Sequence, residues 1–215
     1  MSLVTLTDPR SPVSEAYRAL RTNLSFYSLD DPIETLVVTS AEPNEGKSTT
    51  VANLAVTLAQ AGNRTILVDC DLRKPALHTL FGVANGAGFS EMVLSDGDKM
   101  PLVQTEVENL RLLTSGTKPP NPADLLGSRK CNAVIARLKA DADIVLFDAP
   151  PVIAVTDAVV LGAKVDGVLL VLQAGKSRRD HAERAKQLLE QAKARIVGAT
   201  LTNAPKDDSV GDYYG

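Results

Sequence analysis

The segment from residue 41 to residue 49 constrains this chain more than any other feature of its sequence. It reads Ala-Glu-Pro-Asn-Glu-Gly-Lys-Ser-Thr, follows an apolar run at 35–39 and precedes a stretch with helical periodicity. Its spacing matches the phosphate-binding pattern G-x-x-x-x-G-K-[ST], with Ala41 in place of the first glycine. A glycine turn that only caps a helix is the alternative. The order of strand, loop and helix favours a nucleoside triphosphate site.

Residues at the end of this segment suit phosphate and magnesium binding. Backbone N–H groups around Gly46 would surround phosphate oxygens, and Lys47 would reach the β- and γ-phosphates. The Ser48 hydroxyl would hold Mg²⁺. The residues expected to contact the nucleotide are Asn44, Glu45, Gly46, Lys47, Ser48 and Thr49.

Two further apolar runs end in carboxylates. In the run that starts at Thr65, alternation along a strand predicts that Asp69 and Asp71 share one side while Cys70 points away. Close like charges at a buried strand end destabilise a fold unless a cation or a hydrogen-bond donor compensates them. Mg²⁺ and a substrate hydroxyl would do so. The alternative for each aspartate is a helix N-cap just after a strand.

The second of these runs, 143–147, is followed by Asp148 and two prolines. Proline cannot continue a central strand, so the strand is expected to end at this carboxylate. A carboxylate oxygen is a preferred ligand of Mg²⁺, either directly or through water. We therefore predict a metal site made by Ser48, Asp71 and Asp148.

Composition limits the class of protein. A chain of 215 residues that is 44% hydrophobic can bury one sizeable core, which favours a single α/β domain. It has no run of about 18 apolar residues and no signal peptide, so we expect a cytoplasmic protein without a transmembrane helix. A net charge of −3 argues against nucleic-acid binding. The isolated residues Cys70, Cys131, His78 and His181 are expected to form neither disulfide nor metal site.

Apolar runs rich in β-formers alternate with helical stretches along the chain. Their nearly continuous hydrophobicity is typical of parallel strands that helices bury on both faces. A nucleotide would then lie at the carboxyl ends of the strands. The expected strands lie at about 34–40, 64–70, 109–114, 143–149, 167–174 and 195–203.

Local signals predict further details. The segment 82–108 has little periodicity and is rich in Gly and Asp, which predicts a surface excursion near the nucleotide rather than core. Asn121 with Asp124, and Ser177 with Asp180, are each spaced as a capping box at a helix start.

A helix is expected to start at Ser11-Pro12. Its apolar stripe comprises Val13, Ala16, Tyr17, Leu20 and Leu24. Glu15, Arg18 and Arg21 are spaced three apart and share another face. From spacing alone this is a solvated face with one intrahelical ion pair.

Together these motifs closely resemble the cytoplasmic catalytic domain of the bacterial tyrosine kinases (BY-kinases) that regulate capsular and exopolysaccharide synthesis. Residues 15–24 resemble the family's E-x-x-R-x-x-R element, 41–49 its Walker A, 66–73 its Walker A′ and 144–151 its Walker B. The segment from Pro119 to Leu126 also resembles a family landmark. The resemblance covers nearly the whole chain.

The resemblance implies a doubly wound, mostly parallel P-loop NTPase fold with helices on both faces. The kinase domain would span 11–205, after a lead at 1–10 that is a juxtamembrane linker or a cloning remnant. It also implies a ring-shaped homo-oligomer, expected to be an octamer, that assembles through the first helix, with Glu15, Arg18 and Arg21 at the interface. The tail, 206–215, would offer Tyr213 and Tyr214 as phosphate acceptors to a neighbouring subunit.

Roles for the site residues follow from the same resemblance. ATP would be the substrate and Mg²⁺ the cofactor. Because a tyrosine phenol has a pKa near 10, a base must take its proton, and that base would be Asp69. Lys47 and Asp71 complete the expected catalytic set. By analogy with related P-loop ATPases, Asn203 at the end of the last strand would contact adenine. Arg73 and Lys74 either steer phosphate or are surface residues.

The resemblance further implies partners and a location. A membrane-spanning polysaccharide chain-length regulator, fused or separate, would hold the protein at the inner face of the membrane, and a tyrosine phosphatase would reverse its reaction. Two departures from the family pattern stand out, which are Asn44 where glycine is more common and a tail with few tyrosines.

Two other functions remain open at this stage. One is a MinD/ParA-like ATPase switch, although that family carries a second lysine where this chain has Glu42. The other is a nucleotide-binding scaffold of an export complex.

Overall fold

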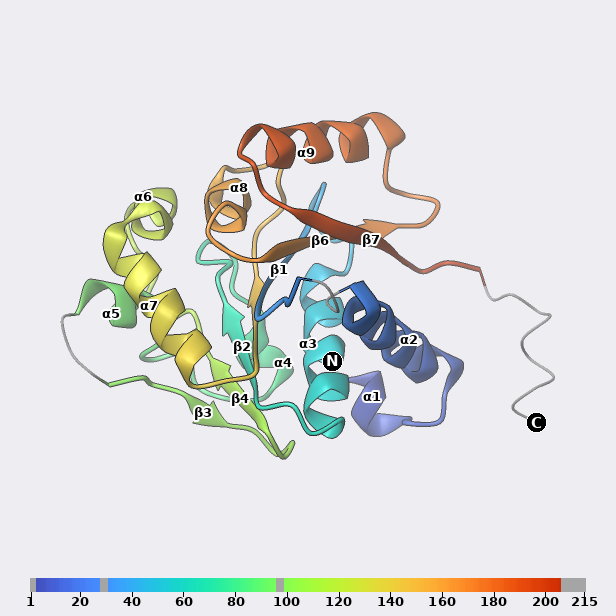
Figure 1. Ribbon diagram of the computed structural model, residues 1–215, viewed down its shortest axis with the longest axis horizontal. Coiled ribbons are helices and arrows are strands. Elements are labelled where there is room, and N and C mark those ends of the chain that lie inside the picture. The colour runs from blue at the N-terminus through green and yellow to red at the C-terminus, as the bar shows by residue number, and fades with distance from the viewer. Residues whose placement is uncertain (1–2, 28–30, 96–98, 206–215) are drawn as a thin grey trace.

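The structure is a computed structural model that describes residues 3–27, 31–95 and 99–205. Helices and strands alternate along most of the chain (Figure 1). The strands are β1 (Thr35–Ser40), β2 (Thr65–Asp69), β3 (Val103–Gln104), β4 (Leu110–Leu113), β5 (Ile144–Asp148), β6 (Gly167–Gln173) and β7 (Ile196–Thr202). The helices are α1 (Val4–Thr7), α2 (Pro12–Tyr27), α3 (Lys47–Gln60), α4 (Leu77–Leu80), α5 (Phe89–Leu94), α6 (Pro122–Gly127), α7 (Arg129–Ala140), α8 (Asp157–Gly162) and α9 (Arg179–Gln191).

The strands form one sheet in the order β3-β4-β2-β5-β1-β6-β7. All neighbouring pairs are parallel except β3 and β4, which are antiparallel. Parallel strands need crossover helices, and these cover both faces (Figure 1). The predicted mostly parallel α/β fold and the six predicted strands are confirmed, while the two-residue β3 was missed.

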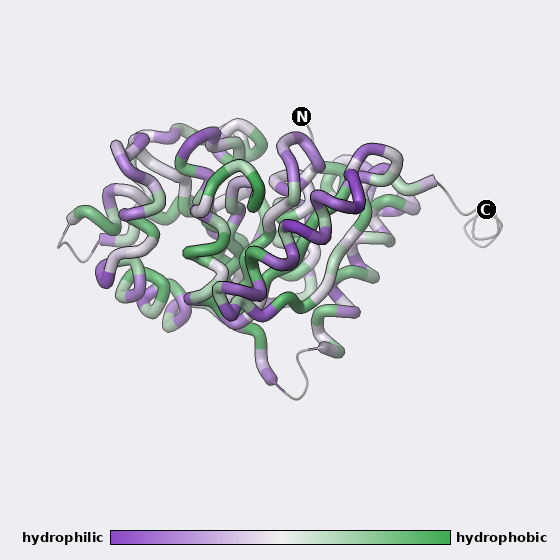
Figure 2. The backbone as a smooth tube through the Cα atoms, turned by 90° about the horizontal axis from the view of Figure 1, so that it is seen from above, coloured by the Kyte–Doolittle hydropathy of each residue, from purple (hydrophilic) through white to green (hydrophobic). Residues whose placement is uncertain are grey.

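Two hydrophobic cores lie on opposite faces of the sheet. Alternate residues of β1 point to different cores, with Val37 in the core under α5–α9 and Leu36 and Val38 in the core under α1–α4. The outer helices alternate between hydrophobic and hydrophilic residues, because each buries only one side (Figure 2). Strands β1, β2, β5 and most of β4 and β6 are thus buried on both faces, which explains their continuous hydrophobicity, whereas β7 at the edge of the sheet is partly exposed.

The prediction that 82–108 lies on the surface was wrong for its middle part. Phe89, Met92 and Val93 on α5 are at most 2% exposed and belong to the core. These residues lie three and four positions apart, so a short helix buries them on one side. A helix of 6 residues is too short to give a clear periodic signal.

Both predicted capping boxes were also wrong. Asn121 precedes α6 but its side chain makes no capping bond. Ser177 lies one residue before the N-cap of α9, and its hydroxyl instead donates to Glu45. Two serines that precede other helices do make such bonds: Ser11 Oγ accepts from the N–H of Ser14 at 3.2 Å, and Ser128 Oγ accepts from the N–H of Cys131 at 3.1 Å.

Helix α2 starts as predicted, but only part of its predicted apolar stripe is buried. Val13 is 49% exposed and Ala16 is also exposed. Leu20 and Leu24 are partly buried and pack against the core. Arg21 Nη1 donates to the carbonyl of Thr57 on α3 at 3.0 Å, so this arginine lies between two helices of its own chain.

The short helix α1 falls in the lead expected at 1–10. Leu3 is 4% exposed, and Thr5 donates through its N–H and its hydroxyl to Oδ1 of Asn53 on α3, at 3.1 and 2.8 Å. In the ranges that the structure describes, no helix is long and apolar enough to cross a membrane.

Candidate active site

The segment 41–49 joins the carboxyl end of β1 to the start of α3. Gly46 has φ 91° and is the N-cap of α3, and its carbonyl accepts from the N–H of Thr50 at 2.8 Å. Asn44 has φ 62°, a left-handed conformation that asparagine tolerates better than most residues. The N-terminal N–H groups of α3 have no intrahelical acceptors, so this helix end suits an anion.

Three predicted carboxylates are buried at the carboxyl ends of β2 and β5. Asp69 and Asp148 are both 0% exposed and are paired residues on adjacent parallel strands, while Asp71 is 4% exposed. The expectation for Cys70 holds, since it lies in the hydrophobic core. Strand β2 ends at Asp69, so Asp71 belongs to the following loop and not to the strand.

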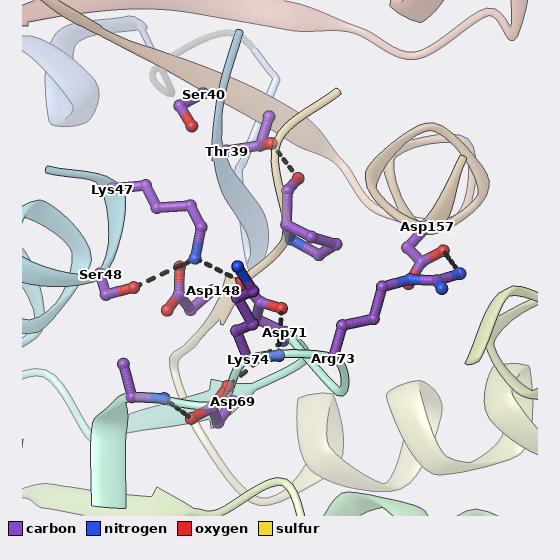
Figure 3. A network of polar contacts seen from close by, with 12 residues as sticks. Thr39, Ser40, Lys47, Ser48, Asp69, Asp71, Arg73, Lys74, Asp148 and Asp157 are labelled. Carbon is purple, nitrogen blue, oxygen red and sulfur yellow. Dashed lines mark hydrogen bonds and ion pairs between the residues drawn. The ribbon is translucent and has the colours of Figure 1, made fainter. Parts of the chain in front are cut away.

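Lys47 connects the loop to these carboxylates (Figure 3). Its Nζ lies 2.9 Å from Oδ2 of Asp71, 3.2 Å from Oδ1 of Asp148 and 3.1 Å from Oγ of Ser48. Burial would lower the pKa of Lys47, but the charges of Asp148 and Asp71 outweigh burial and raise it. The lysine therefore stays charged beside the predicted metal ligands.

Asp69 has a different environment. Its Oδ2 accepts from the N–H groups of Ala76 and Leu77, at 3.0 and 2.9 Å, at the start of α4. The alternative role as a helix cap is thus partly realised, although seven residues separate this aspartate from the amide of Ala76. Burial, followed by the charge of Asp148, raises the pKa of Asp69 to about 7 despite those two hydrogen bonds.

One carboxylate oxygen of Asp148 makes no hydrogen bond to a described residue. Its Oδ1 contacts Lys47, whereas its buried Oδ2 has no hydrogen-bond partner among the described residues. Burial raises the pKa of Asp148, and the charge of Lys47 only partly opposes it. A buried oxygen without a donor beside a hydroxyl and a second carboxylate fits a hard cation such as Mg²⁺.

Arg73 is neither a free surface residue nor directed at this site. Its Nε and Nη2 donate to Oδ2 and Oδ1 of Asp157, each at 2.9 Å (Figure 3). Asp157 is fully buried in the first turn of α8. This bidentate pair joins the loop after β2 to the segment after β5. Sequence reasoning missed Asp157, because one aspartate before an apolar run signals only a helix start.

The other predicted residues lie outside this cluster. Arg18 pairs with Glu15 on the same helix and donates from Nη2 to the carbonyl of Pro9 at 2.7 Å. The predicted intrahelical ion pair is therefore present. Asn203 follows β7, with φ 53° and an exposed side chain. The predicted acceptors Tyr213 and Tyr214 lie outside the described residues.

Both cysteines are free and buried. Burial raises the pKa of Cys131 to about 11 and that of Cys70 well above its ordinary value. Neither thiol is a nucleophile near neutral pH.

Comparisons with known proteins agree with this geometry. The family profile described as ParA, NUBPL iron-transfer P-loop NTPase, matches residues 33–203. Tyrosine-protein kinase YwqD of Bacillus subtilis (strain 168) is 42% identical over 217 residues, which cover 100% of this chain and 91% of that protein. The kinase domain of Escherichia coli tyrosine kinase ETK has a TM-score of 0.91 and 32% identity, covering 97% of this chain and 82% of that one.

A second solved structure is equally informative. The chimerical protein CapA2B2 has a TM-score of 0.89 and 38% identity, covering 95% of this chain and 90% of that one. The observed fold and the relatives that span nearly the whole sequence indicate the same family. This chain is a P-loop NTPase of the ParA type and belongs to the bacterial tyrosine-protein kinases.

Proposed function

We propose that this chain is an autokinase that transfers the γ-phosphoryl group of ATP to the C-terminal tyrosines of neighbouring subunits. The observation that carries this proposal is the buried pairing of Asp69 and Asp148 on adjacent strands, beside Lys47 of the phosphate-binding loop. The proposed base, the Lys47 ammonium and a proposed metal ligand lie together at one edge of the sheet. Phosphoryl transfer to a hydroxyl requires these three groups.

In the proposed reaction Asp69 takes the phenolic proton as the tyrosine oxygen attacks the γ-phosphorus. The bond from that phosphorus to the β–γ bridging oxygen then breaks, and ADP leaves with the bridging oxygen. Lys47 stabilises the negative charge on the β- and γ-phosphate oxygens. Tyrosine suits this chemistry only with a base, because its phenol is almost fully protonated at neutral pH.

Ser48, Asp71 and Asp148 would hold Mg²⁺ in this proposal. The oxygen without a donor on Asp148 supports the assignment. When bound, Mg²⁺ neutralises phosphate charge and orients the phosphoryl group for in-line attack.

Nucleotide contacts are proposed for Asn44, Glu45, Gly46, Ser48 and Thr49, through the backbone N–H groups that precede and begin α3. An adenine contact is proposed for Asn203. It is supported by its neighbour Thr202, whose Oγ1 donates to the carbonyl of Glu45 in the same loop at 2.8 Å.

Assembly into a ring, expected to be an octamer, is proposed through α2, with Glu15, Arg18 and Arg21 at the interface. The exposed apolar side chains of Val13 and Phe26 on the same helix, 49% and 67% exposed, support an interface role. The contact of Arg21 with Thr57 of its own chain means that this arginine also contributes to the fold of one subunit.

The ring is tested by light scattering on a Glu15→Ala, Arg18→Ala, Arg21→Ala variant. A matched control removes another exposed helical pair, Arg179 and Glu183 on α9. The triple variant should be a folded monomer with slower transfer to tyrosine and unchanged nucleotide affinity. A triple variant that stays oligomeric would refute the interface.

We further propose a role in capsular or exopolysaccharide synthesis, beside a membrane-spanning chain-length regulator at the inner face of the membrane. A tyrosine phosphatase would reverse the modification. The solved chimerical protein CapA2B2, which is 38% identical to this chain, supports the proposal of an activator partner. In the proposal the phosphatase acts on phosphorylated Tyr213 and Tyr214.

The ATPase switch remains the second candidate because the ParA-type profile matches most of the chain. Its second lysine is replaced by Glu42, whose Oε1 lies 2.9 Å from Nδ1 of His181. A glutamate at that position cannot supply the positive charge that the second lysine supplies in MinD/ParA-like ATPase switches. A scaffold without catalysis would not need the buried carboxylates.

Incubation with γ-labelled ATP and Mg²⁺, followed by phosphotyrosine mapping, tests the proposed function. Label on Tyr213 or Tyr214 is the expected result. ATP hydrolysis without phosphotyrosine would favour the switch, and nucleotide binding without either reaction would favour the scaffold.

A further inference from the structure

Glu45 places a carboxylate inside a loop that should bind phosphate. It directly precedes Gly46, and only 1% of its surface is exposed. A negative charge beside a triphosphate would weaken nucleotide binding unless the side chain is directed elsewhere and held there. The contacts of Glu45 are therefore informative about how the loop is arranged.

Both carboxylate oxygens of Glu45 are occupied. Oε2 accepts from the N–H of Glu42 at 2.8 Å, and Oε1 accepts from the hydroxyl of Ser177. The Ser177 Oγ itself accepts from the N–H of Gln173 at 2.7 Å. A carboxylate oxygen can only accept, so the serine hydroxyl donates to Glu45 while its oxygen accepts from Gln173.

Neighbouring side chains contact the same part of the loop, and those of Lys176 and Thr202 do so through hydrogen bonds. Nζ of Lys176 donates to the carbonyl of Asn44 at 3.1 Å, and Nδ1 of His181 lies 2.9 Å from Oε1 of Glu42. Oγ1 of Thr202 donates to the carbonyl of Glu45 at 2.8 Å. We call Lys176, Ser177, His181 and Thr202 the P-loop contact residues. They come from the connection between β6 and α9, from α9 itself and from the end of β7.

The backbone on both sides of Glu45 has left-handed angles. Asn44 and Gly46 have φ of 62° and 91°. Glycine adopts this region without a steric penalty, and asparagine adopts it more readily than most residues. The sequence of the loop therefore permits this conformation, and the contacts of Glu45 with distant residues select it among the conformations that such flexible positions allow.

We propose that Glu45, oriented by Ser177, is a positioning residue that fixes the phosphate-binding loop in its nucleotide-binding conformation. The pair acts through the loop backbone and does not touch the transferring phosphoryl group. Its loss should therefore weaken nucleotide binding and leave the rate at saturating ATP nearly unchanged. The turnover measurement rests on the proposed kinase function, whereas the binding measurement rests only on the loop.

The test measures the Kd of a fluorescent ADP analogue with Mg²⁺, together with KM and kcat for ATP. Ser177→Ala should weaken ADP binding about tenfold, which corresponds to about 1.4 kcal/mol. Ser177→Thr keeps the hydroxyl and should restore most of the affinity. Arg179→Ala is the matched control, because this α9 residue is 92% exposed at its side chain and contacts only Glu183 of its own helix in the described contacts.

Glu45→Ala should raise Kd at least as much as Ser177→Ala. The double variant should be no weaker than Glu45→Ala alone, because the serine acts through this carboxylate. If Glu45→Ala does not fold, the two Ser177 variants still decide the question. Unchanged ADP affinity in Ser177→Ala, or a lower kcat at unchanged KM, would overturn the proposal. Normal ADP binding in a wild type without phosphotransfer would refute only the kinase function.

Discussion

Removal of either member of the Arg73–Asp157 pair should destabilise the protein, but by unequal amounts. The side chain of Asp157 is 0% exposed and that of Arg73 is 38% exposed, and two hydrogen bonds of 2.9 Å join them. Arg73→Met would leave a buried carboxylate without its counter-ion. Asp157→Asn would leave a guanidinium that already reaches water and an amide oxygen that still accepts from it.

These differences set the expected magnitudes. A buried charge without its partner costs about 3–5 kcal/mol, so Arg73→Met should lower the free energy of unfolding by about that much. Asp157→Asn loses charge assistance in two hydrogen bonds but strands no buried charge, which costs about 1–2 kcal/mol. Replacement of both partners by Met and Leu should recover part of the loss in Arg73→Met, because no buried charge is then left unpaired.

Urea unfolding at neutral pH, followed by far-ultraviolet circular dichroism, measures these free energies. Arg179→Met is the matched control, since the same substitution at a side chain that is 92% exposed should change stability by no more than about 0.5 kcal/mol. The reasoning fails if Asp157→Asn costs as much as Arg73→Met. It also fails if the double variant is less stable than Arg73→Met alone.

Three other predictions concern single side chains. Lys47→Met should reduce phosphotransfer by about a hundredfold or more in a labelled-ATP assay, and retained activity would refute its assigned role. Asp69→Asn should lower phosphotransfer by about 10²–10⁴-fold with nearly unchanged Kd for ATP and Mg²⁺, whereas an equal loss of affinity would identify a metal-site residue. Burial opposes ionisation of Asp166, but hydrogen bonds from Thr35 and the N–H of Glu34 outweigh it and lower its pKa. Asp166→Asn should thus lose about 1–2 kcal/mol at pH 7. This difference, measured by urea unfolding, should shrink as the pH falls from about 4 through the lowered pKa, and a constant difference down to pH 3 would contradict the reasoning.

The sheet and the carboxylate cluster were predictable because their signals are local. Strands buried on both faces give continuous apolar runs, and Val37 and Leu36 indeed lie in different cores. Parallel strands end at the same edge, so residues such as Asp69 and Asp148 come together even though the chain between them is long. The phosphate-binding loop has a spacing pattern that few other structures share.

The side-chain contacts that hold these residues in place were not predictable in the same way. Arg73 and Asp157 are 84 residues apart, and Ser177 is 132 residues from Glu45. Neither pair has a periodic or spacing signal, because each depends on which loops the sheet order brings together. For Ser177 the local signal was misleading, since a serine before a helix predicts a cap and this serine donates to another loop instead.

The two pairs hold different parts of the proposed site, and this separation has a consequence for function. Arg73–Asp157 joins the segment after β2 to the segment after β5. The proposed base and the proposed aspartate ligands of the metal lie at the ends of these two strands or just after them. Ser177–Glu45 joins the phosphate-binding loop to the connection after β6. If strand ends alone determined the geometry, neither kind of variant would change the kinetics of the site. Because each pair fixes a different loop, the first should act on phosphotransfer and its Mg²⁺ dependence, and the second on nucleotide affinity.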